Sequence, residues 1–310
     1  MTKLFIIGNG FDSAHGLPTK FVDYKNSFNM GDFYYDEDDE KSEIELISRN
    51  RTKNDDIGTL DVDDTKRFAF QTLCACATDK DNWSDIEESI AKAPELRFNT
   101  EITMTELEGS EIVIAVSTMK EYFDIWIAGI NISKSRPKPD FRTLTSDQDL
   151  FLTFNYTETL EEVYNIPESQ ICHIHGKRMT VKGKTIVKGI ELGHGEKPRK
   201  ISDMVTDYYE YVSLKRKAHQ SIRKKTSKIL YRNRNFFNKI YSNDIIEIYS
   251  YGFSFGSVDR YYFEKLFKKL DTTKIVWHFN DHSDFNEMIK HAVILTLCGF
   301  KGTFDKYHID

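Results

Sequence analysis

Two histidines separated by one residue, His173 and His175, are the side chains best suited to proton transfer in this 310-residue sequence. A neutral imidazole accepts protons near pH 7. The apolar run Ile171–Ile174 predicts a strand here, and residues two apart in a strand point to the same face, so we expect both rings on one face. Gly176 leaves open space beside the second ring. The alternatives are a structural histidine pair, or a metal site for which His194 is the only further ligand.

A second polar segment, Thr153-Phe154-Asn155-Tyr156-Thr157, ends the apolar run Leu150–Phe154. In open parallel sheets the carboxyl ends of strands face the ligand crevice. There the amide of Asn155 can orient a water molecule or a ribose hydroxyl, and Thr153 can contact the same ligand. The alternative is that Asn155 or Thr157 caps the following helix.

The N-terminal apolar run Lys3–Ile7 leads into the glycine-rich turn Gly8-Asn9-Gly10-Phe11-Asp12. A strand followed by Gly-x-Gly at a helix start lets the backbone approach a diphosphate, and the helix N-terminus offers free N–H groups. Ser13 stands where the usual fingerprint has its third glycine. We therefore expect these five turn residues to hold a diphosphate, or else to form a tight turn without a ligand.

A third turn, Gly252-Phe253-Ser254-Phe255-Gly256, follows another apolar strand, and Asp259 lies three residues beyond it. We expect Gly252, Ser254 and Asp259 to contact the ribose of a nucleotide. The spacing Gly-x-Ser-x-Gly also matches the nucleophile elbow of α/β-hydrolases, so a serine hydrolase using Ser254 is a further alternative. Its acid and base would come from residues later in the chain, namely Asp271 or Asp281, and His282, His291 or His308.

Two charged segments lie outside these turns. Asp85, Glu87 and Glu88 cluster at an apparent helix start, where carboxylates are favourable in any case, or else reach the ligand crevice. The basic segment Lys215–Arg234 has tyrosines and phenylalanines within or beside it. Cations with aromatic rings suit single-stranded nucleic acid, and the alternative is a solvated helix face.

Alternating strands and helices must position these residues. We expect strands at Lys3–Ile7, Leu150–Phe154, Ile171–Ile174, Ile186–Leu192 (the last in a hairpin with the segment around Val181), Asp244–Tyr251 and Ile275–Phe279. Helices are expected at Asp12–His15, Phe68–Ile90, Glu111–Ile130, Thr157–Tyr164, Val258–Leu270 and Phe285–Leu297. This alternation predicts an α/β, Rossmann-like fold with a mostly parallel sheet flanked by helices.

The chain organisation that we expect is one domain over residues 1–310. A largely helical insertion spans 32–147 and ends in a proline-containing linker, Ser133–Asp147. A basic helical insertion spans 197–242, and a nucleic-acid or protein partner would bind there.

Composition limits the class of protein. The chain is 39% apolar and 30% charged with a net charge of -6, so a nucleic-acid role needs a local basic patch. The four cysteines form no C-x-x-C pair, which disfavours a zinc ribbon. There is no apolar run of membrane-spanning length, and only a short one precedes Gly8. We expect a cytoplasmic protein without a membrane partner, and a homo-oligomer is left open.

Taken together, these motifs resemble the AbiH family of bacteriophage abortive-infection proteins. The resemblance covers nearly the whole chain in order, over Ile7–Asp12, Gly16-Leu17-Pro18-Thr19, Trp83–Glu87, Phe151–Leu160, Ile174-His175-Gly176 and Gly252–Asp259. It implies an antiphage role that halts growth of the infected host.

The same segments are similar to a diverged sirtuin pattern. Gly8-x-Gly10 resembles the sirtuin glycine loop, Thr153-Phe154-Asn155 its T-Q-N segment, His175-Gly176 its catalytic H-G and Gly252-Phe253-Ser254 its G-T-S turn. The resemblance implies a sirtuin-like fold and a pocket for NAD, with Asn155 and His175 at its chemical centre.

The chain also departs from the sirtuin pattern. The sequence has no zinc-binding cysteine set, and Asp12 replaces the serine of the glycine loop. An ADP-ribose derivative or another nucleotide fits as well as NAD. We therefore expect an effector that binds and hydrolyses NAD or a related nucleotide. The alternative is a non-catalytic, nucleotide-sensing module.

Overall fold

The computed structural model describes residues 2–28, 69, 106–181, 184–193, 220, 223–280 and 284–309. Several predictions fall outside the described residues. These are the helix at Phe68–Ile90, the acidic cluster at Asp85–Glu88, His194, most of Lys215–Lys224, Asp281 and His282.

Six parallel strands form the central sheet in the order β3-β2-β1-β6-β7-β8. Their bounds are β1 Thr2–Ile7, β2 Leu150–Thr153, β3 Ile171–His173, β6 Ile245–Tyr251, β7 Val276–Asn280 and β8 Thr303–Tyr307. Strands β1 and β6 lie at the centre of the sheet. From there β2 and β3 follow towards one edge, and β7 and β8 towards the other. This arrangement is an α/β Rossmann-like fold with its topological switch point between β1 and β6, where such folds bind ligands.

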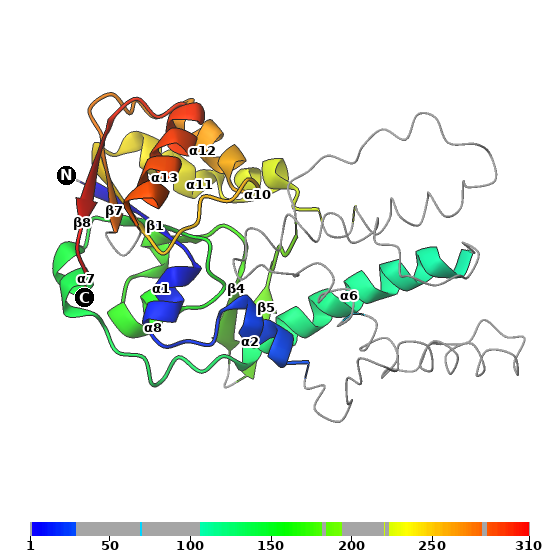
Figure 1. Ribbon diagram of the computed structural model, residues 1–310. Coiled ribbons are helices and arrows are strands. Elements are labelled where there is room, and N and C mark those ends of the chain that lie inside the picture. Colours follow the sequence, from blue (N-terminus) through cyan, green and yellow to red (C-terminus); the bar gives the residue numbers. More distant parts are fainter. Residues whose placement is uncertain are drawn as a thin grey trace, which may run out of the picture.

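Helices cover the two faces of the sheet around separate cores (Figure 1). On one face α1 (Asn9–Ala14), α7 (Pro139–Leu144) and α8 (Thr159–Tyr164) pack around aromatic side chains such as Phe5 and Phe141. On the other face the helices surround Trp277, which is fully buried. They are α10 (Thr226–Arg232), α11 (Arg234–Ser242), α12 (Arg260–Phe267) and α13 (Phe285–Leu297).

A third cluster lies beside the sheet. It joins α2 (Phe21–Asn26), the long helix α6 (Glu106–Gly129) and the antiparallel hairpin of β4 (Lys177–Val181) and β5 (Lys184–Lys188). Figure 1 shows α6 running away from the sheet beside this hairpin. A 3₁₀ turn over Glu168–Gln170 precedes β3.

Three expectations about elements need correction. The segment Ser133–Asp147, expected as a linker, contains α7, because Pro139 starts a helix well and Phe141 buries its ring in the core. The strand expected over Ile186–Leu192 lies at Lys184–Lys188, in the predicted hairpin. The sixth strand of the sheet, β8, was not expected, because four of its five residues are exposed at the edge of the sheet.

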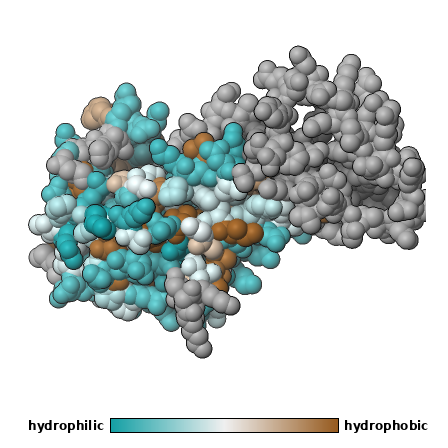
Figure 2. All heavy atoms as spheres, turned by 90° about the horizontal axis from the view of Figure 1, so that it is seen from below, coloured by the Kyte–Doolittle hydropathy of each residue, from teal (hydrophilic) through white to brown (hydrophobic). Residues whose placement is uncertain are grey.

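The surface of the described residues is mostly polar on the side seen from below the view of Figure 1. Among the coloured residues, Figure 2 shows mainly hydrophilic and intermediate ones, with apolar residues in small separate patches. Among the described helices, none is long and apolar enough to span a bilayer.

Candidate functional site

Two strand–helix turns meet at the switch point through their glycines. A Cβ atom on Gly8 would lie 2.4 Å from the Gly252 carbonyl oxygen, and one on Gly252 would lie 2.3 Å from the Phe11 nitrogen. Gly252 has a φ of +61°. The N–H of Gly8 donates to Tyr251 and that of Gly10 to Gly252, at 3.0 and 2.9 Å. The glycines therefore allow two backbone segments to touch, and these N–H groups are occupied within the protein.

The remaining turn residues mostly face inward. The ring of Phe11 is fully buried among aromatic residues, whereas Asn9 is partly exposed. Asp12 is 1% exposed and accepts hydrogen bonds from the hydroxyls of Thr157 and Thr159, at 2.5 and 2.8 Å. Burial raises the pKa of Asp12 to about 6. These hydrogen bonds thus connect α1 to the start of α8.

Asn155 lies beside this carboxyl group at the end of β2. Its backbone N–H donates to Thr153 Oγ1 at 3.1 Å, and its carbonyl accepts from His173 Nδ1 at 3.1 Å. The side-chain amide is close enough to Asp12 to lower the pKa of that carboxyl, yet its buried Nδ2 makes no hydrogen bond of normal geometry. Asn155 does not cap α8, whose N-cap is Glu158. The buried amide of Asn155 thus lies against the Asp12 carboxyl group.

His175 lies on the other side of the same edge, in a nearly enclosed polar cluster. Its ring is 3% exposed and packs edge-on against Phe154, with centroids 5.3 Å apart. Nδ1 lies 3.3 Å from Lys224 Nζ, and Nε2 lies 3.5 Å from Asp259 Oδ1. Burial, and then the charge of Lys224, hold the pKa of His175 well below its usual range. The imidazole is therefore neutral near pH 7, with the carboxylate of Asp259 at one nitrogen and the ammonium group of Lys224 at the other.

His173 has different surroundings. Its Nε2 lies 2.9 Å from Glu161 Oε1, which also accepts from Lys177 at 3.0 Å. Burial works against ionisation of Glu161, but the His173 and Lys177 interactions outweigh it and lower its pKa to about 2. The expectation that both rings share one face was wrong, because β3 ends at His173 and the chain turns at Gly176, where φ is +84°.

A comparison with known families identifies one family model that matches the chain. The family model described as "Bacteriophage abortive infection AbiH" matches residues 4–281, which include both glycine turns, Asn155, His175 and Asp259. The chain belongs to the AbiH family. Its role therefore lies in abortive infection, the antiphage response named in that description. No curated protein and no solved structure was found that matches the chain.

In this AbiH protein the turn around Ser254 does not form a nucleophile elbow. The positive φ falls on Gly252 and on Phe255, whose φ is 55°. Ser254 is exposed, and α12 begins only at Arg260, whereas an elbow places its serine directly before the helix. Within the described part of the chain, Ser254 makes no hydrogen bond to a histidine.

Among the described residues, no group of three or more histidine, cysteine, aspartate or glutamate side chains is arranged to hold a metal ion.

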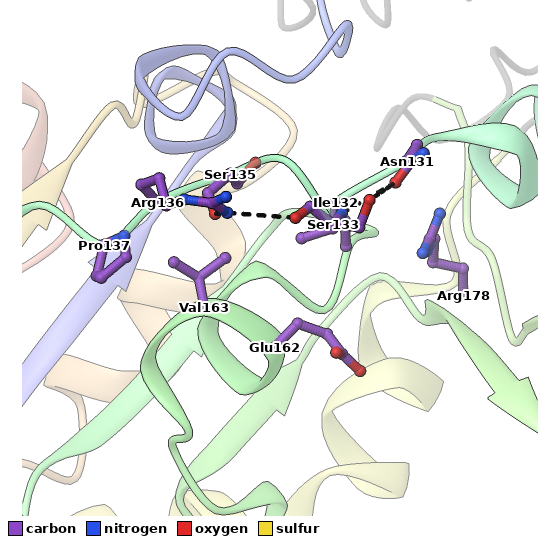
Figure 3. Close-up of a pocket in the computed structure, with 9 residues that line it drawn as sticks. All are labelled: Asn131, Ile132, Ser133, Ser135, Arg136, Pro137, Glu162, Val163 and Arg178. Carbon is purple, nitrogen blue, oxygen red and sulfur yellow. Dashed lines mark hydrogen bonds between the residues drawn. The ribbon is translucent and has the colours of Figure 1, made fainter.

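A cavity of about 590 Å³, drawn in Figure 3, lies beside helix α8 of the AbiH protein. The loop 131–137 forms one side of it, Glu162 and Val163 form another, and Arg178 stands at one end. Arg178 is held by Glu158, with Nε and Oε2 2.6 Å apart, and donates to the carbonyl of Ile130. No residue predicted from the sequence as a site residue lines this cavity.

Sequence reasoning missed some residues of the AbiH site. Lys224 is 2% exposed beside His175, but in the sequence it is one basic residue among many in its segment. The sequence pattern around Thr159 predicts only a helix, although its hydroxyl donates a hydrogen bond to Asp12. Neither residue carries a local signal, since only the meeting of distant segments gives it a role.

Proposed function

We propose that this chain is an effector of abortive infection that binds NAD, or a related nucleotide, at the carboxyl edge of the sheet and hydrolyses it. The observation that supports this most is the convergence of His175, Asp259 and Lys224 from three distant segments of the chain. Burial and the charge of Lys224 lower the pKa of His175, so the imidazole becomes a proton acceptor once Lys224 is displaced and Asp259 is left to stabilise the imidazolium.

The proposed reaction is hydrolysis of the bond between nicotinamide and ribose. Asn155 positions a water molecule, whose oxygen attacks the anomeric carbon of the ribose. The carbon–nitrogen bond breaks, and its electron pair leaves with nicotinamide. His175 accepts the proton that the water loses, and Asp259 stabilises the resulting imidazolium. The products are nicotinamide, ADP-ribose and a proton.

The occupied glycine turn changes the expected way of binding. Because the N–H groups of Gly8 and Gly10 already donate within the protein, they do not hold a diphosphate in this conformation. In the proposal these glycines, with Gly252, fix the edge of the sheet on which the nucleotide binds. The proposed binding mode therefore does not depend on direct contacts between these glycines and phosphate.

Access to the centre is narrow in this conformation, with Asn155 and His175 6% and 3% exposed. A nucleotide must displace Lys224 from His175 before it can reach the imidazole. This suits an effector that stays silent until infection, because a site open at all times would consume nucleotide in healthy cells.

The test uses the purified full-length chain incubated with NAD, with and without lysate of phage-infected cells. We expect release of nicotinamide in at least one condition, measured by liquid chromatography, and its loss in the His175→Gln variant. His278→Gln is the matched control, because His278 is a mostly buried histidine that stacks on Tyr249, away from the proposed centre. Intact NAD in both conditions, with folding confirmed by circular dichroism, contradicts the proposed hydrolysis.

A second candidate is a nucleotide-sensing module whose basic surface binds nucleic acid. It is favoured by exposed cations beside tyrosines. The Arg234 guanidinium lies 4.5 Å from the ring centroid of Tyr231, which is 67% exposed, and Lys265 Nζ lies 5.0 Å from that of Tyr261. Such pairs suit the bases and phosphates of a single strand.

Titration calorimetry separates the two candidates. Binding of NAD without turnover favours the sensing module. Its nucleic-acid part predicts that affinity for a single-stranded oligonucleotide falls steeply as salt rises. An affinity that does not change with salt removes the basic surface from the proposal.

A further inference from the structure

A stripe of large apolar side chains runs along the outer side of α13. Phe285, Ile289, Val293 and Leu297 are 72%, 47%, 53% and 79% exposed, and they repeat every four residues. Residues four apart are neighbours on a helix surface, so these four form one continuous ridge, the α13 stripe.

The inner side of the same helix is also apolar. Leu295 is fully buried, and Met288 and Ala292 pack against the core around Trp277. A helix at the surface of a protein normally presents polar side chains outward, and one that is apolar on both sides is normally buried. The α13 stripe is therefore suited to contact another apolar surface.

An exposed phenylalanine and a hollow lie on the same face of the molecule as the α13 stripe. Phe304 on β8 is 37% exposed and stacks on Phe279, on the face of the sheet that α13 covers. A hollow of about 290 Å³ is lined by Ile289, Ala292, Val293, Thr296 and Leu297, and it can receive a side chain of a partner.

We propose that the α13 stripe is the contact between two copies of this chain, related by a two-fold axis with their α13 helices antiparallel. A two-fold contact must be complementary to itself. Reversing the stripe places Phe285 against Leu297 of the partner subunit and Ile289 against Val293 of the partner subunit. The two residues at the ends of the stripe then contact each other, and the two β-branched residues contact each other between them. Ridges of residues four apart interdigitate when two helices cross at about −50°.

The available area fits a stable dimer. The exposed parts of Phe304 and the four stripe residues amount to roughly 100 Å² each, or about 500 Å² per copy. A standard interface of about 800 Å² per partner contains roughly 450 Å² of non-polar surface. The α13 stripe together with Phe304 thus supplies the non-polar share of an ordinary dimer contact.

Sedimentation of the full-length chain tests the proposal. We expect wild-type protein to sediment at twice the mass of one chain. Ile289→Lys alone and Val293→Glu alone are each expected to sediment as single chains, because either change buries an unpaired charge at the contact twice. The control is Ile125→Lys, a change at a 61% exposed residue on α6 away from the stripe, which should stay dimeric.

Mixing the two variants identifies the occupant. In the antiparallel arrangement, the lysine introduced at position 289 of one chain meets the glutamate introduced at position 293 of the other, so the mixture should recover the dimer. Its recovery also shows that both variants are folded. A wild-type monomer contradicts the proposal, as does a dimer that survives both changes. A mixture that remains monomeric overturns the antiparallel pairing and favours a different occupant, such as another segment of this chain.

Discussion

Burial of the Asp12 side chain favours the neutral form of its carboxyl group. Burial raises its pKa from 3.8 to about 6, even though Thr157 and Thr159 donate to it. Above pH 6 this group is ionised in both the folded and the unfolded chain. Between pH 6 and 3.8 the folded chain binds a proton that the unfolded chain does not. The free energy of unfolding contributed by Asp12 therefore rises as pH falls, by up to about 3 kcal/mol.

Asp12→Asn tests this linkage, because asparagine keeps the shape of the neutral acid. We expect the variant to lack the gain in stability at acidic pH that Asp12 gives the wild type. Urea unfolding at about pH 7.5 and about pH 4.5 measures it, and the exposed carboxylate change Asp147→Asn is the control. The same pH dependence in wild type and Asp12→Asn would contradict the raised pKa.

Residue types alone pointed to His175 and Asn155, because an imidazole and an amide after apolar strands are chemically conspicuous. The burial of both and the nearness of His175 to Asp259 result from the order of the strands, which the local sequence does not state. Lys224 could not be predicted, since nothing in its own segment indicates burial. Candidate chemistry was thus visible in the sequence, whereas the partners that tune it were not.

At the scale of elements, the turn after β1 and the turn after β6 touch through their backbones. Gly252 has a φ of +61° and would bring a Cβ within 2.4 Å of two Gly10 backbone atoms. We expect Gly252→Ala to lower the free energy of unfolding by about 3 kcal/mol or more, since both a strained backbone and a backbone clash result. Urea unfolding measures the loss.

Gly189→Ala is the matched control for this change. Gly189 has a similar φ of +67°, but a Cβ there would have no heavy atom within 4 Å. This change should lower the free energy of unfolding by only about 1 kcal/mol, the cost of placing alanine in a left-handed backbone conformation. Equal losses in the two variants would show that the close approach of the two turns adds nothing.

Elements with strong local signals were predictable to within a few residues. The ends of α13 were expected at Phe285 and Leu297, where the structure has them, because Asp284 caps its start. The strand β8 was missed, since at the edge of the sheet Asp305 and Lys306 interrupt its apolar pattern. Helix α12 spans Arg260–Phe267 and is therefore shorter at both ends than the expected Val258–Leu270.

For the whole molecule, the alternation of strands and helices predicted a parallel α/β sheet, and the structure confirms it. The strand order was not predictable, because it depends on which helix crosses which face. That order places the turns after β1, β2, β3 and β6 at one edge. The edge therefore gathers residues that lie more than a hundred positions apart, as Thr157 and Asp12 do.

The activity of the whole molecule can be followed in infected bacteria. In abortive infection an infected cell stops growing before phage is released. Cells that express the chain should therefore form fewer plaques, and a culture infected at a high ratio of phage to cells should still collapse. If the proposed hydrolysis causes the arrest, cellular NAD should fall before lysis in wild-type cells. His175→Gln cells should keep their NAD and lose protection, whereas His278→Gln cells should behave like wild type. Protection that persists in His175→Gln cells with constant NAD would place the arrest in another part of the molecule, and the basic surface of α10 to α12 would then be tested next.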